Sequence, residues 1–77
     1  MQVTLRFHGH AIEYVPGGQE TLTVDVPAGQ TLRQILTTIG IQPQLFAAVV
    51  VGGHRRDLEY VPEPGDEVML LSPAAGG

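Results

Sequence analysis

The sequence predicts a small α+β domain in which one helix covers one face of a β-sheet. Residues 3–7 and 22–26 alternate apolar and polar side chains with the period of two that is typical of half-buried strands. They are expected to pair as a wide antiparallel hairpin. A single apolar stripe at helical spacing follows them. Because one helix can cover only one face of a sheet, two layers are favoured.

The predicted helix has recognisable start and stop signals. Its apolar stripe has the spacing i, i+3, i+4 and i+7 and consists of Leu32, Ile35, Leu36 and Ile39. Thr31 and Gln34 have the spacing of a capping box, in which each side chain bonds the other residue's amide. Gly40 suits the left-handed position just past a helix end. We expect a helix of about nine residues that depends on packing against the sheet.

Two further segments are predicted to complete the sheet. Residues 46–51 are a continuous apolar run, typical of an interior strand, and residues 67–71 form the last strand. Residues 54–60 are polar and are expected to be a loop or to include a short edge strand, since two prolines soon follow. Residues 11–15 are expected to extend the pairing of the first strand.

Composition limits the possible functions. The 77 residues suffice for one domain, and the absence of cysteine excludes disulfides, thiolate metal sites and a thiol nucleophile. Eight acidic residues outnumber four arginines, there is no lysine, and the net charge is −4, which disfavours a nucleic-acid partner. No signal-peptide layout is present, and no apolar run approaches the roughly 20 residues of a membrane span. We therefore expect a cytoplasmic protein without a membrane partner.

The last predicted strand is apolar on both faces. Val68 and Leu70 are expected to face the core, which leaves Met69 and Leu71 on the open face of the sheet. An uncovered apolar patch on a small protein is typical of a docking surface for another protein. The alternative is that residues 10–18 fold over this patch.

The other polar residues form no catalytic or metal-binding constellation. The chain has three histidines, His8, His10 and His54. None has a carboxylate or cysteine at ligand spacing, so we expect exposed turn histidines and no metal site. Asp66 is interpreted as a turn residue. Arg55 and Arg56 are either solvated turn residues or docking contacts for an acidic site on a partner.

After Pro73 the sequence contains only small residues: Ala74, Ala75, Gly76 and Gly77. No side chain in this stretch could anchor it, so we expect a flexible tail of residues 74–77 after a domain of residues 1–73. Glycine lacks Cβ, and an extended Gly-Gly end can therefore pass through a channel too narrow for other residues. Such a tail resembles a substrate arm presented to another protein's active site.

The C-terminal part of the chain resembles the signature of the prokaryotic ubiquitin-like sulfur-carrier family (MoaD/ThiS-like). This part consists of residues 64–68, the apolar strand that follows them and residues 72–77. Residues 28–32 are similar to that family's strand-to-helix step. Residues 49–53 are similar to its third strand and turn, where Asn-Gly is more usual than Gly-Gly. The resemblance covers nearly the whole chain. It implies a β-grasp (ubiquitin-like) fold, with a mixed four- to five-stranded sheet and one main helix packed on one face.

The resemblance also implies a reaction cycle run by partners. A ubiquitin-activating-type adenylyltransferase would use ATP to adenylate the Gly77 carboxylate, and a persulfide-bearing sulfur donor would displace AMP to leave a thiocarboxylate. A sulfur-acceptor synthase subunit would then receive the sulfur. The carrier itself would bind no cofactor and would not be an enzyme alone. Residues 74–76 would thread into the partner, and four residues would dock on it: Met69, Leu71, Arg55 and Arg56.

Several functions fit this resemblance. The Pro-Ala-Ala-Gly-Gly end looks closest to the molybdopterin-synthase small subunit, which favours molybdopterin cofactor biosynthesis. The compact loop before residue 46 is similar to that of the thiamine carriers, so thiamine biosynthesis or tRNA thiolation are alternatives.

A different class of function is a protein modifier conjugated through Gly77. Without lysine it could not build lysine-linked chains on itself, although it could be attached once to a target. A third possibility is a β-grasp interaction module whose Gly-Gly end is incidental.

Overall fold

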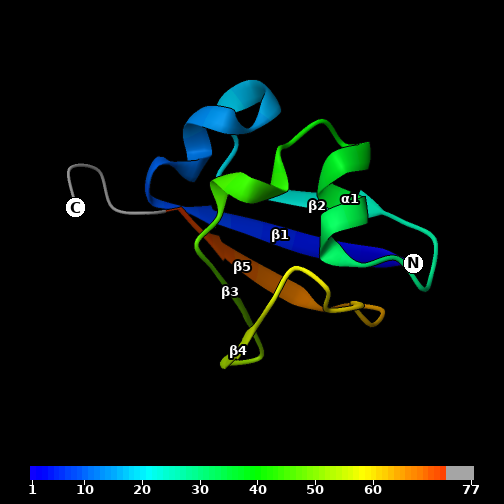
Figure 1. The fold of residues 1–77 in the computed structure, drawn as a ribbon. Coiled ribbons are helices and arrows are strands. Elements are labelled where there is room, and N and C mark those ends of the chain that lie inside the picture. Colours follow the sequence, from blue (N-terminus) through cyan, green and yellow to red (C-terminus); the bar gives the residue numbers. More distant parts are fainter. Residues whose placement is uncertain (73–77) are drawn as a thin grey trace.

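The computed structural model describes residues 1–72, apart from the side chains of His10, Ala11, Tyr14 and Pro16. This part of the chain contains one five-stranded sheet, one α-helix and three short 3₁₀ helices (Figure 1). The strands are β1 (Gln2–His8), β2 (Thr21–Asp25), β3 (Ala48–Val51), β4 (His54–Arg56) and β5 (Glu67–Leu71). The helices are α1 (Leu32–Thr38), η1 (Gly9–Tyr14), η2 (Pro16–Gly18) and η3 (Pro43–Leu45). None of the helices described has the length and apolar character needed to traverse a lipid bilayer.

The strand order of the sheet is β2-β1-β5-β3-β4. Strand β1 pairs antiparallel with β2 and parallel with β5, while β3 is antiparallel to both β5 and β4. The β3–β4 hairpin closes through Gly52 and Gly53, whose φ angles of 59° and 80° suit a tight two-residue turn. Helix α1 packs across one face of the sheet, as Figure 1 shows. The predicted α+β architecture is therefore confirmed.

The core lies between α1 and the sheet. Its fully buried strand residues follow the expected period of two and are Val3, Leu5, Phe7, Val68 and Leu70. Helix α1 adds three completely buried side chains from its apolar stripe, Leu32, Ile35 and Leu36. Val15 belongs to the same buried cluster, and Ile12 packs against it. Residues 9–18 therefore close one end of the core on the helix side of the sheet.

The start of α1 has the predicted capping box. The Thr31 hydroxyl accepts a hydrogen bond from the Gln34 amide at 3.2 Å, and Gln34 Oε1 accepts one from the Thr31 amide at 2.9 Å. Thr31→Ala should lower the free energy of unfolding by about 1 kcal/mol, because it leaves an N-terminal amide of the helix without its partner. Urea denaturation measures the change. Thr31→Ser keeps the hydroxyl and should retain most of the stability; equal losses in both variants would contradict the capping role.

Two details of the sheet differ from the sequence prediction. Residues 11–15 do not extend β1, and that prediction was wrong. Gly9 has a φ of 67°, which turns the chain out of β1 and into η1. Strand β3 begins at Ala48 rather than at residue 46, because η3 and its cap occupy the preceding positions. Residues 54–56 form the short edge strand that the sequence left open.

Candidate docking surface

The open face of the sheet carries an apolar patch of four half-buried side chains: Ala48, Val50, Met69 and Leu71. Met69 lies opposite Val50 and Leu71 opposite Ala48 in the β3–β5 register, so their side chains are neighbours on one face. The predicted orientation of β5 is confirmed, since the residues between them are fully buried on the other face. We call these four residues the open-face patch.

Residues 10–18 do not fold over the open-face patch. The described side chains of Ile12 and Val15 pack with the core, on the helix side of the sheet. Figure 1 shows η1 and η2 on that same side, together with α1. The alternative in which this segment covers the patch is therefore wrong.

Two arginines flank the open-face patch along one row of the sheet. Arg6 lies opposite Met69 in the β1–β5 register, and Arg55 lies opposite Val50 in the β3–β4 hairpin. Arg6 Nη1 contacts Glu67 Oε1 at 2.7 Å, an exposed ion pair that contributes little to stability. Within residues 1–72, Arg55 makes no hydrogen bond or ion pair. Its guanidinium is therefore available to an acidic group on a partner.

Arg56 lies on the opposite face from Arg55. It pairs in register with Val49, which is 2% exposed and belongs to the core, so Arg56 projects on the helix side. Its guanidinium carbon lies 5.3 Å from the centre of the Tyr60 ring, within the range of a cation–π contact. Of the two arginines predicted to dock, the structure thus brings Arg55 alongside the open-face patch and places Arg56 on the other face.

The loop between β4 and β5 is held by two contacts that sequence reasoning missed. The Tyr60 hydroxyl donates to Asp66 Oδ2 at 2.6 Å, and the Glu63 amide donates to the same oxygen at 2.9 Å. Asp66 therefore holds the loop closed, in addition to its predicted place in the turn after Gly65. The loop also accepts hydrogen bonds from the first amides of α1, through the carbonyls of Tyr60 and Leu58. Arg56 consequently rests on a fixed aromatic ring.

The Tyr60–Asp66 contact predicts a loss of stability at alkaline pH. The hydrogen bond to Asp66, followed by burial, raises the pKa of Tyr60 above its ordinary value of 10.0. A raised pKa means that the neutral phenol is favoured in the folded state. Its contribution is complete below pH 10 and is lost as the pH rises through the folded-state pKa. Urea denaturation from pH 8 to 11 should show this decline, and Tyr60→Phe should flatten it; an unchanged profile in Tyr60→Phe would contradict the assignment.

The predicted working end of the chain, Ala74 to Gly77, lies outside the described residues. The structure shows what precedes it. Leu71 is held between two neighbouring strands, opposite His8 and Ala48, and Ser72 Oγ donates to the His8 carbonyl at 3.4 Å. The last four residues thus follow closely after a residue of the open-face patch.

Comparison with known proteins supports the fold. No protein-family model and no curated protein matches this sequence. Among solved structures, SAMP1 from Haloferax volcanii matches with a TM-score of 0.76 and 23% identity over 100% of both chains. Urm1 from Trypanosoma brucei matches with a TM-score of 0.69 and 21% identity, covering 99% of this chain and 95% of that one.

A third match comes from the complex of subunits 1 and 2 of the molybdopterin-converting factor of Helicobacter pylori. Its TM-score is 0.64 and its identity is 26%, over 100% of both chains. The match to these proteins confirms the predicted β-grasp, ubiquitin-like fold. The resemblance seen in the sequence, to ubiquitin-like sulfur carriers of the MoaD/ThiS type, agrees with it.

Proposed function

We propose that this protein is a sulfur carrier whose working group is the carboxylate of Gly77. The observation that carries the proposal is the position of the open-face patch. On a β-grasp body, the apolar residues Met69 and Leu71 lie on the last strand, which only Ser72 and Pro73 separate from a small-residue Gly-Gly end. Met69 and Leu71 would dock on a partner, and Ala74, Ala75 and Gly76 would thread into its active site.

The chemistry explains why such a carrier needs an ATP-using partner. A C-terminal carboxyl group has a pKa of about 3.5, so at neutral pH it is an anion that resists nucleophiles. Adenylation by a ubiquitin-activating-type enzyme converts it into an electrophile. The terminal sulfur of a donor persulfide then attacks the acyl carbon, and AMP leaves with the bonding electron pair. A thiol reductant cleaves the remaining S–S bond to free the thiocarboxylate. The carrier contributes position and delivery and binds no cofactor.

Molybdopterin cofactor biosynthesis is the pathway we favour. The Helicobacter pylori match comes from a complex of two subunits of a molybdopterin-converting factor, which supports a synthase subunit as the sulfur acceptor. A match to subunit 1 of a putative molybdopterin-converting factor from Pyrococcus furiosus, at 14% identity and a TM-score of 0.70, supports the same choice. Thiamine biosynthesis and tRNA thiolation remain the alternative destinations.

A protein modifier conjugated through Gly77 is the second candidate. The match to the small archaeal modifier protein 1 of Haloferax volcanii favours it, at 22% identity and a TM-score of 0.73. Both functions begin from the same adenylate, so the products distinguish them. The protein is incubated with an activating enzyme, ATP and a sulfur donor, and then with iodoacetamide. Alkylation of this cysteine-free chain would support the carrier, and larger conjugates would support the modifier. The absence of both products would contradict both functions.

A further inference from the structure

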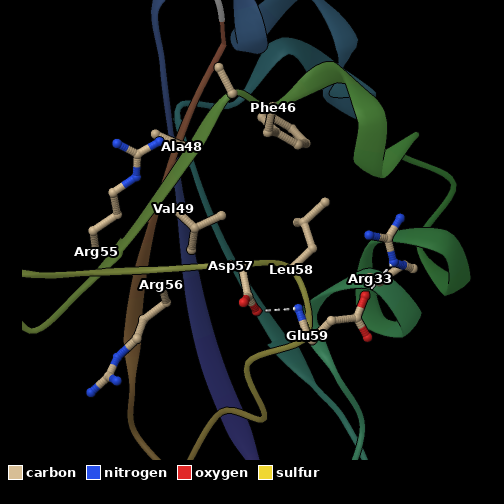
Figure 2. Close-up of a pocket in the computed structure, with 10 residues that line it drawn as sticks. Arg33, Phe46, Ala48, Val49, Arg55, Arg56, Asp57, Leu58 and Glu59 are labelled. Carbon is tan, nitrogen blue, oxygen red and sulfur yellow. Dashed lines mark hydrogen bonds and ion pairs between the residues drawn. The ribbon is translucent and has the colours of Figure 1, made fainter.

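A groove of about 370 Å³ lies on the helix side of the sheet edge, between β3 and the turn that follows β4. Figure 2 shows the side chains of Phe46, Val49 and Leu58 converging on this space from three segments of the chain. Phe46 and Val49 are only 8% and 2% exposed, so they are fixed by the core. The floor of the groove is therefore apolar and rigid.

The rim of the groove is basic. Three of the chain's four arginines line it, Arg33, Arg55 and Arg56, although the protein as a whole has a net charge of −4. Two carboxylates also line it, but both have partners within the protein. Glu59 accepts from Arg33 Nε at 2.8 Å, and Asp57 accepts from the Glu59 amide at 2.9 Å.

Arg33 and Glu59 offset each other, whereas Asp57 keeps its negative charge because its partner is a neutral amide. Arg55 and Arg56 are therefore the cations of the rim without a carboxylate partner, and the lining carries a net charge of +1. In Figure 2 they extend on one side of the apolar floor, and Arg33 lies with Glu59 on the other. Within residues 1–72 neither has a carboxylate partner. A ligand that fits this groove carries negative charge next to an apolar group.

A second hollow of about 430 Å³ shares Arg55, Arg56, Asp57 and Glu59 with the first and extends it to Tyr60. Arg56 is already oriented against the Tyr60 ring, which Asp66 holds in turn, so less freedom is lost when its guanidinium binds an anion. Two adjoining hollows favour an extended chain over a single small anion.

We propose that this groove binds an extended acidic peptide segment of a partner protein. One apolar side chain of the segment packs on Phe46, Val49 and Leu58, and a neighbouring carboxylate binds Arg56. A second carboxylate reaches Arg55 around the edge of β4. The groove shares Ala48 with the open-face patch, but its apolar floor lies on the helix side of the sheet, and binding there does not depend on any chemistry at Gly77. A single-stranded nucleic acid is disfavoured, because in the described part of the chain only two arginines of the rim lack a carboxylate partner, too few to neutralise a run of phosphates.

The test is an NMR titration of the full chain, labelled with ¹⁵N. The ligand is a peptide of sequence Ser-Glu-Asp-Leu-Asp-Glu-Ser with an acetylated N-terminus and an amidated C-terminus. We expect amide and guanidinium shifts at Arg56, Leu58 and Glu59, with a dissociation constant of about 1 mM. Arg56→Gln should weaken binding by about tenfold, since it removes a charge-assisted hydrogen bond. Arg6→Gln is the matched control, because Arg6 lies outside the groove, and should change binding by less than about twofold.

Other outcomes would overturn the proposal. The first is an absence of shifts, and the second is shifts centred on Met69 instead of the groove. Equal losses in Arg56→Gln and Arg6→Gln would show that the peptide responds only to net charge. Tighter binding of a single-stranded oligothymidylate at the same residues would assign the groove to nucleic acid. No activating enzyme takes part, so each result is independent of whether Gly77 carries sulfur.

Discussion

Deletion of Gly77 should abolish ATP-dependent activation of this protein and leave its folding unchanged. The proposed adenylation site is the main-chain carboxylate of that residue, and its removal shifts the new terminus back by one position. Within residues 1–72 the buried core ends at Leu70, and the tail is predicted to lie outside the core, so stability should not change. ATP–pyrophosphate exchange with the activating enzyme measures the first effect. It should fall to the level of the enzyme alone, while thermal unfolding stays the same.

The control for this deletion is Ala75→Gly, which keeps the chain length and the terminal carboxylate. It should preserve most of the exchange activity, because the position of the reacting group does not change. Undiminished exchange in the Gly77 deletion would show that activation does not require a carboxylate at position 77. Unfolding of the deletion variant would show that the last residues belong to the packed body.

Met69→Asp should weaken binding of the activating enzyme by about 30-fold or more. The substitution places a charge in the open-face patch, and truncation of a central interface residue typically costs at least about 2 kcal/mol. Met69 is half-buried on the open face, so the fold should tolerate the change. Isothermal titration calorimetry measures the affinity, and circular dichroism checks the fold.

Thr23→Asp is the matched control for that experiment. Thr23 is exposed on β2, opposite Thr4 and on the same face of the sheet, but β1 separates it from the patch. Thr23→Asp introduces the same charge and should change the affinity for the activating enzyme by less than about twofold. If both Met69→Asp and Leu71→Asp bind as well as the unaltered protein, the open-face patch is not the docking surface.

Local patterns in the sequence predicted most of the fold. The capping box at Thr31 and Gln34 depends only on residues three positions apart, and the structure contains it. The alternation of β1 and the inward orientation of Val68 and Leu70 follow from the two-residue period of a strand. The same two-residue period was enough to predict that Met69 and Leu71 lie on the open face of the sheet.

Contacts between distant residues could not be predicted in this way. Gly9 turns the chain out of β1 beside Ser72, where an added Cβ would lie 3.2 Å from the Ser72 hydroxyl. No periodicity in residues 9–18 indicates that turn. The sequence predicts Arg55 and Arg56 as one docking pair, because it leaves open whether residues 54–60 form a loop or a strand. Once β4 is known, its period of two places them on opposite faces.

The most direct test of the account is the intact mass of the protein after co-expression with an activating enzyme and a sulfur donor. Replacement of the terminal OH by SH should add about 16 Da, and fragmentation should locate the added mass at Gly77. An unchanged mass, with an activating enzyme that is shown to be active on another carrier, would contradict the proposed function. So would a fragment showing that the mature chain continues beyond Gly77.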